Sequence, residues 1–104
     1  MSGRYPFMLT LDIIRKRLRT AMPQLKERYK VASLKVFGSF SRGAQGKGSD
    51  VDLLVEFNET IDLLEYAELE MYLGELLGTK VDLVTAETLK PRLRDAVLAE
   101  AVGI

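Results

Sequence analysis

The sequence contains no cysteine and no histidine, and both absences restrict the chemistry available to it. Without cysteine the chain forms no disulfide and offers no thiolate nucleophile. Without histidine, Ser-His-Asp and Cys-His catalysis, zinc hydrolysis and an imidazole base are excluded. Ionic chemistry therefore falls to Asp, Glu, Lys, Arg, Tyr or Ser. A metal bound by their oxygen atoms would be a hard cation, with Mg²⁺ as the default.

Long apolar runs are also missing, since none approaches the roughly 18 residues that a membrane helix needs. The first ten residues lack the pattern of a cleaved signal segment, so we expect a cytoplasmic protein without a membrane partner. With 104 residues and 47% hydrophobic content, the chain predicts one globular domain over residues 1–104. We expect residues 1–9 to form a flexible tail.

The formal net charge is zero, but the charges are unevenly placed. Residues 10–30 carry seven Lys or Arg against two acids, and residues 49–79 carry nine Asp or Glu and no base. The acidic middle argues against broad nucleic-acid binding and suits a metal site or a basic partner. The basic residues of the first segment form either a solvated helix face or a partner contact; they are Arg15, Lys16, Arg17 and Arg19.

Apolar spacing predicts three helical segments and three strands. We expect a helix over residues 11–30, capped by Thr10 and kinked or split at Pro23. A second helix begins after a Thr60 cap and stops at Gly78, and a last one starts at Thr85 or Thr88, with Pro91 in a helix-start position. The predicted strands are residues 34–37, 50–57 and 81–84. The order is therefore α-β-loop-β-α-β-α.

The second helix has a broad apolar band. Six of its apolar residues are expected to be mostly core: Ile61, Leu64, Leu69, Leu73, Leu76 and Leu77. Three further residues widen the band beyond one stripe: Tyr66, Met71 and Tyr72. Either they pack within the domain or they form a partner interface.

Two aspartates open the second strand, and a third lies inside the last strand. Period-two geometry places Asp50 and Asp52 on one face, with Cα atoms about 6.5–7 Å apart. If the strands pair, Asp82 joins them on that face. Two unit charges ~6 Å apart at an effective dielectric near 20 repel by roughly 3 kcal/mol. Such a cluster requires a cation or a proton, and a pair of Mg²⁺ ions is the natural occupant.

A glycine-rich loop precedes these aspartates. Gly38 lets the backbone adopt positive φ and approach a phosphate, and Ser39 offers a hydroxyl. A helical turn around residues 41–44 would direct N–H groups to the same place. Arg42 either contacts phosphate or fixes the loop by a salt bridge. Lys47 either adds charge at the phosphates or is solvated.

The combined pattern resembles a known enzyme superfamily. It consists of Gly38-Ser39, ten residues, Asp50-Val51-Asp52, and Asp82 in a later apolar strand. This arrangement is similar to the nucleotidyltransferase superfamily related to DNA polymerase beta. Residues 30–104 resemble its minimal nucleotidyltransferase (MNT) branch, through Ser41-Arg42-Gly43, Leu89-Lys90-Pro91-Arg92-Leu93 and Glu100-Ala101-Val102. Ser41 departs from the branch, which often has alanine there.

The resemblance implies an α+β fold, with a small mixed β-sheet and helices packed mainly on one face. It implies that Gly38 and Ser39 contact the triphosphate of ATP. Asp50 and Asp52 would bind two Mg²⁺ ions, and Asp82 would bind the catalytic one and help to deprotonate the acceptor. Members of this branch commonly act as antitoxins that adenylylate a tyrosine of a HEPN-type toxin. The resemblance thus makes a HEPN toxin the expected partner, with oligomers of the complex left open.

Two other functions remain open at this stage. Residues 85–104 are too short for an acceptor-binding domain, so a docking protein is the simplest acceptor. The chain could instead neutralise its partner by binding alone, which the acidic middle and the extra apolar residues of the second helix favour. Nucleotidyl transfer to a small molecule is the weaker alternative, since no domain is left to bind one.

Overall fold

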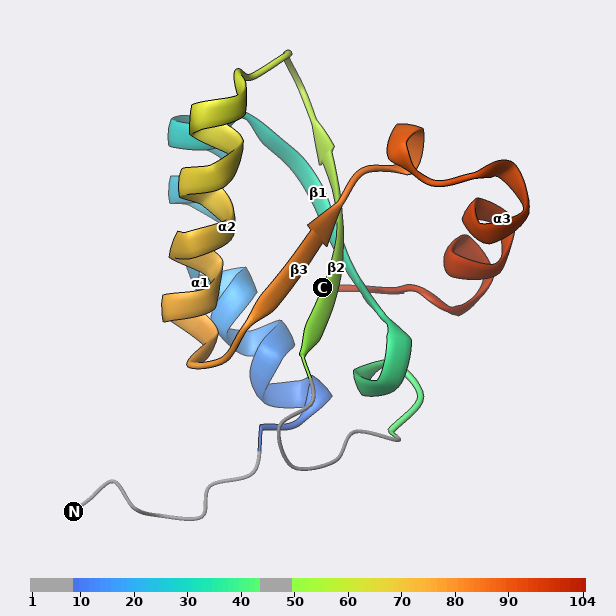
Figure 1. Ribbon diagram of the computed structural model, residues 1–104. Helices are drawn as coiled ribbons and strands as arrows, with labels where there is room; N and C mark the ends of the chain where they lie inside the picture. Colours follow the sequence, from blue (N-terminus) through green and yellow to red (C-terminus); the bar gives the residue numbers. More distant parts are fainter. Residues whose placement is uncertain (1–8, 44–49) are drawn as a thin grey trace, which may run out of the picture.

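The computed structural model describes residues 9–43 and 50–104. Its helices and strands follow one another in the predicted order, with one additional strand at the end (Figure 1). The elements are α1 (Leu11–Tyr29), β1 (Val31–Phe37), β2 (Val51–Phe57), α2 (Leu63–Leu77), β3 (Val81–Val84), α3 (Pro91–Glu100) and β4 (Val102–Gly103). Two short 3₁₀ turns, η1 (Gly38–Phe40) and η2 (Ala86–Thr88), follow β1 and β3.

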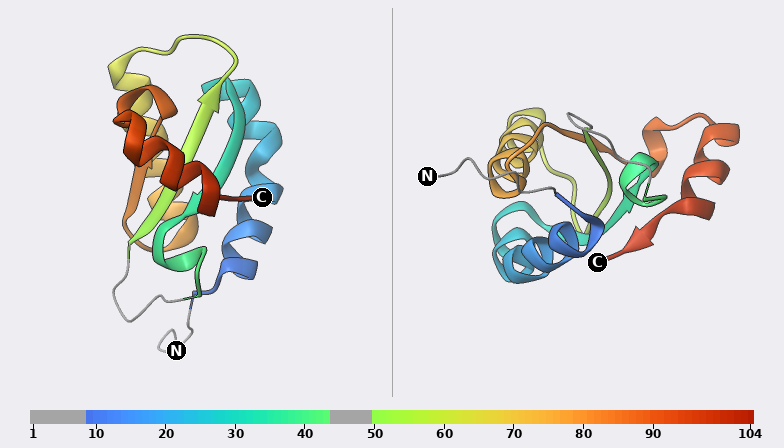
Figure 2. Two further views of the ribbon diagram at one scale, coloured as in Figure 1. Left: turned by 90° about the vertical axis from the view of Figure 1, so that its right-hand side faces the viewer. Right: turned by 90° about the horizontal axis from the view of Figure 1, so that it is seen from below.

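The strands form one mixed sheet in the order β3-β2-β1-β4. β1 runs antiparallel to β2 and β4, whereas β2 and β3 are parallel. Helices α1 and α2 lie side by side on one face of the sheet, and α3 lies on its other side (Figures 1 and 2). The predicted α+β architecture, a small mixed sheet with helices mainly on one face, is confirmed.

The main core lies between the sheet and the α1–α2 layer. Helices α1 and α2 and strands β1 and β2 all contribute fully buried side chains to it, among them Ile14, Leu18, Leu25, Val31, Val36, Val51, Leu53, Leu69 and Leu73. Leu54 and Val97 are buried outside this cluster. Because side chains alternate along a strand, Leu54 faces the α3 side of the sheet. The two faces of β2 are therefore both covered at its centre.

Helix α1 confirms its predicted start. The Thr10 hydroxyl accepts a hydrogen bond from Ile13 N at 3.3 Å, which satisfies one of the free N–H groups of the first turn. Of the kink or split expected at Pro23, the split does not occur, because the residue lies inside one continuous helix with its side chain exposed. Lys30 ends the helix with φ 60°, in the left-handed region.

Helix α2 begins later than expected. Asp62, not Thr60, is its N-cap: the Asp62 carboxylate accepts from Glu65 N at 2.8 Å, and Glu65 Oε1 accepts from Asp62 N at 3.1 Å. This reciprocal capping box satisfies two free donors at once, which a threonine cap two residues earlier could not do. Gly78 ends the helix as predicted, with φ 75°.

The predicted core face of α2 is correct at its centre and wrong at its start. Leu69, Leu73 and Leu77 are buried, but Leu64 is 74% exposed. Met71 is also exposed, whereas Tyr66 and Tyr72 are partly buried and pack against the core. Leu64 lies about 180° around the helix from Leu73, so it points away from the core and stays exposed, together with Leu63 beside it.

The start of β1 and the two ends of the described chain also differ from expectation. Strand β1 starts three residues earlier than predicted, and β4 was not predicted; its Val102 pairs with Val36. Leu9 packs against the core, so the expected tail is too long by that residue, and residues 1–8 lie outside the described range. Within the described residues, no helix is both long and apolar enough to span a membrane.

Candidate functional site

Gly38 directly follows β1, at a position that only glycine can occupy without strain. Its φ is +75°, a conformation that side chains disfavour. A Cβ atom at this position would clash with Oδ2 of Asp52, which β2 presents from the neighbouring strand. The β1–β2 register explains this approach, because Phe37 pairs with Asp52. The loop glycine and the central carboxylate are thus packed against each other.

The turn that follows Gly38 is helical but lies earlier than expected. The 3₁₀ turn covers Gly38–Phe40 rather than residues 41–44, of which Ala44 lies outside the described chain. Phe40 is buried and fixes the turn to the core, and Ser41 Oγ donates to Gly38 O at 2.8 Å. Ser39 is half-buried beside them. The predicted contact residue Lys47 also lies outside the described chain.

The aspartates meet across the parallel pair of strands. Asp52 is directly opposite Asp82 in the β2–β3 register, and paired strands lie about 4.8 Å apart. Asp50 immediately precedes β2, two residues from Asp52 and so on the same side of the strand. Asp52 is half-buried, and the other two are exposed. The condition on which the sequence-based prediction depended, that the two strands pair, is therefore confirmed for Asp52 and Asp82.

Electrostatic repulsion is concentrated on Asp52. Burial raises the pKa of Asp52 above its usual value, the charges of Asp82, Asp50 and Glu100 raise it further, and Arg42 lowers it. The charged form of this carboxylate is thus disfavoured in the protein without a counter-ion. Asp82 contributes the first of these like charges, which agrees with its position opposite Asp52.

A hard divalent cation fits this donor set. Carboxylate oxygens are the ligands that Mg²⁺ prefers, and such a cation would offset the repulsion that raises the pKa of Asp52. Across residues 9–43 and 50–104, no three acidic side chains are already gathered as a metal-binding group. Small side-chain rotations, or oxygens of a bound substrate, would have to complete the coordination.

Glu100, at the end of α3, is the site residue that the sequence-based prediction did not assign. Its Oε2 accepts from Gly38 N at 2.9 Å, and its Oε1 accepts from Arg42 Nη1 at 2.9 Å. These two hydrogen bonds hold the pKa of Glu100 below its usual range. Only its place in the family-like C-terminal segment could have indicated it, because its partners lie about sixty residues away in sequence. Of the two roles considered for Arg42, the structure contains the salt bridge.

Residues 16–104 match the family described as a nucleotidyltransferase domain. The chain belongs to this family. The match includes the glycine-rich loop, the three aspartates and Glu100. The chain is therefore a nucleotidyltransferase, and the opposed carboxylates beside the loop occupy the part of the fold where its chemistry is expected.

Three similar proteins indicate which members of the family this chain resembles. Protein adenylyltransferase MntA of Thermococcus cleftensis is 46% identical over 97 residues, which are 93% of this chain and 98% of that protein. A solved structure described as a candidate minimal nucleotidyltransferase is 42% identical with a TM-score of 0.79, over 96% of this chain and all of that one. A toxin–antitoxin complex crystallised with AMP-PNP contains a chain 28% identical with a TM-score of 0.68, covering 82% of this chain and 69% of its own length.

Proposed function

We propose that this protein transfers AMP from ATP to a hydroxyl group, by preference a tyrosine, of a HEPN-type toxin and thereby acts as its antitoxin. The observation that carries the proposal is the pair Asp52 and Asp82, directly opposed across parallel strands, with Asp52 packed against Gly38. The similarity to a protein adenylyltransferase supports AMP as the transferred group. The similarity to a toxin–antitoxin complex with AMP-PNP supports both the nucleotide and the partner.

The proposed reaction is an in-line displacement at the α-phosphate. The oxygen of the acceptor hydroxyl forms a bond to the α-phosphorus, the bond from that phosphorus to the bridging oxygen breaks, and pyrophosphate leaves. Asp82 accepts the hydroxyl proton, while Gly38 and Ser39 hold the triphosphate. Asp50 and Asp52, with Asp82, would hold one or two Mg²⁺ ions, which supply Lewis-acid stabilisation of the charge on the phosphates.

The test is transfer from ATP labelled on its α-phosphate to a purified HEPN-type partner in the presence of Mg²⁺. We expect label on the partner with wild-type protein and none with the double substitution Asp50→Asn and Asp52→Asn. The double variant should remain folded, because both changes remove repelling charges and preserve shape. A partner that binds the protein but never gains label would contradict the proposal.

Neutralisation by binding alone is a second candidate, and exposed leucines favour it. Leu63 and Leu64 at the start of α2 are 83% and 74% exposed, which is unusual for adjacent large apolar residues. If binding suffices, a variant with all three aspartates changed to asparagine still protects cells from the toxin. Loss of protection with retained binding would reject this candidate and support the catalytic one.

A further inference from the structure

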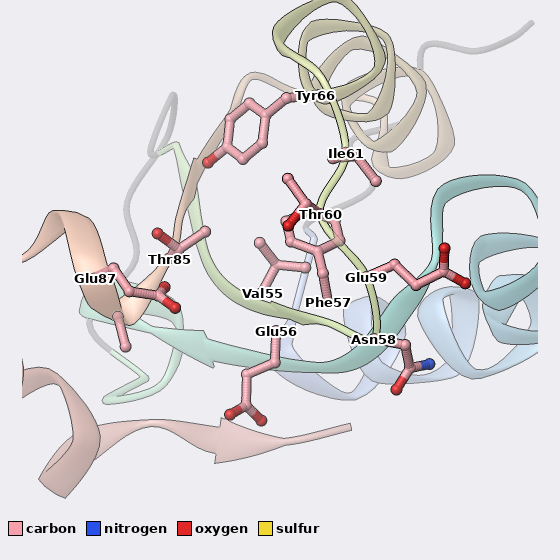
Figure 3. A pocket seen from close by; sticks show the side chains of 11 residues that line it. Val55, Glu56, Phe57, Asn58, Glu59, Thr60, Ile61, Tyr66, Thr85 and Glu87 are labelled. Carbon is pink, nitrogen blue, oxygen red and sulfur yellow. The ribbon is translucent and has the colours of Figure 1, made fainter.

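A cavity of about 530 Å³ lies away from the aspartates, where β2 and β3 end (Figure 3). Its apolar wall consists of Val55, Phe57, Ile61 and Tyr66. The loop between β2 and α2 forms one rim, and η2 forms the other. No residue assigned to nucleotide or metal lines it.

The cavity exists because β3 is shorter than β2. Their parallel pairing ends at Leu54 opposite Val84, after which the chain turns away into η2. The last three residues of β2, Val55–Phe57, therefore have no strand beside them on that edge. An uncovered strand edge presents backbone N–H and C=O groups, and extended peptides bind such edges by adding a short strand.

The lining carries charge of one sign. Glu56, Glu59 and Glu87 contribute carboxylates, and among residues 9–43 and 50–104 no lysine or arginine lines the cavity. Ser33 Oγ donates to Glu56 at 2.7 Å, whereas Glu59 and Glu87 are exposed and make no ion pair within residues 9–43 and 50–104. Arg94 is engaged with backbone, since its Nε donates to Ala86 O at 2.9 Å. A cationic side chain entering the cavity would thus meet carboxylates without competition from the protein's own bases.

We propose that this cavity docks the acceptor protein, by receiving an extended segment that carries arginine or lysine a few residues from the acceptor hydroxyl. This inference rests on the proposed function and adds to it the chemistry by which the acceptor is chosen. The uncovered β2 edge binds the backbone of the segment, the apolar wall receives the aliphatic stem of the cation, and the carboxylates bind its charge. The exposed Leu63 and Leu64 at the start of α2, just outside the lining, extend the apolar surface.

The distance to the aspartates fixes the spacing within that segment. Thr85, which lines the cavity, is three residues beyond Asp82, so about 10 Å of strand separates them. Tyr66, which also lines the cavity, donates its hydroxyl hydrogen to Leu83 O at 2.6 Å, next to Asp82 in sequence. An extended acceptor segment covers the same distance in about three residues. The basic residue is therefore expected about three positions from the acceptor hydroxyl.

The experiment uses two fluorescent peptides of equal length, each with one tyrosine and two charged residues three positions from it. The charged residues are arginine in one peptide and glutamate in the other. Binding is measured by fluorescence anisotropy, and AMP transfer is followed with labelled ATP. The cavity variant is Glu59→Lys with Glu87→Lys. The matched control is Glu75→Lys with Asp95→Lys, which makes the same charge change at exposed positions outside the lining.

We expect wild-type protein to bind the arginine peptide at least about tenfold more tightly than the glutamate peptide, with a preference that weakens as salt is added. The control should keep this preference and the cavity variant should lose it, with the peptide KM rising and kcat nearly unchanged. Equal binding of the arginine peptide to the cavity variant and the control would overturn the docking site. A retained binding preference with no AMP on either peptide would reject the proposed transfer while the docking site stands.

Discussion

At the scale of single residues, Gly38 and Asp52 depend on each other. Replacing Gly38 by alanine combines a positive φ with a clash against the Asp52 carboxylate. Gly43 offers a matched control, since its φ is +69° and a Cβ there meets no described atom within 4 Å. We expect Gly43→Ala to lower the free energy of unfolding by about 1 kcal/mol and Gly38→Ala by roughly 2–4 kcal/mol. Urea denaturation measures the free energy of unfolding of both variants. Equal losses would show that the Asp52 side chain moves aside without destabilising the fold.

Asp52 also predicts a pH-dependent stability. Its pKa is raised in the folded protein, so its favourable contribution is present below its unfolded pKa and is lost as pH rises through the folded value. At about pH 7 and without divalent cations, Asp52→Asn should therefore raise Tm, by about 2–4 °C for about 0.5 kcal/mol. Near pH 4 the gain should fall toward zero. Thermal denaturation at both pH values checks this, and a gain independent of pH would contradict the charge explanation.

At the scale of the elements, two residues near the start of α2 could act as its N-cap, and only one of them does. Asp62 and Glu65 form the capping box, whereas Thr60 is exposed in the preceding loop. Asp62→Ala should lower the free energy of unfolding by about 1 kcal/mol, because it leaves a helical N–H without an acceptor. Thr60→Ala should be nearly neutral. Chemical denaturation measures the free energy of unfolding of both variants. A larger loss for Thr60→Ala than for Asp62→Ala would show that Thr60 is the cap, as the sequence predicted.

Elements that depend on local pattern were predictable from the sequence, and those that depend on distant contacts were not. The alternation in residues 50–57 and the apolar run at 81–84 were enough to place Asp52 and Asp82 on one side of a sheet. Strand β4 was not predictable, because its two residues carry no periodicity and pair with Lys35 and Val36 far earlier in the chain. The burial of α2 failed at Leu64 because this residue does not share the face of the buried leucines: at 3.6 residues per turn it lies about 180° around the helix from Leu73.

At the scale of the whole molecule, the two sides of the sheet are unequally packed. The α1–α2 layer holds the main core, while α3 buries only Val97 among its residues. Leu93 and Leu98 remain exposed on that helix. Local opening should therefore release α3 before the rest of the fold. Hydrogen exchange should show amide protection in α3 about tenfold or more below that around Leu69 and Leu73, and equal protection would contradict this order.

The weakly packed helix nevertheless ends on the Gly38 loop, for which we proposed a role in binding the triphosphate. Glu100 binds both the Gly38 N–H and Arg42, so the last turn of α3 is attached to the loop by one carboxylate. An anion that draws Arg42 toward itself leaves Glu100 with a single partner and loosens that attachment. We therefore expect occupancy of the loop to affect α3, which lies on the same side of the sheet as Asp52. The packing of the last turn of α3 is therefore expected to differ between the filled and the empty loop.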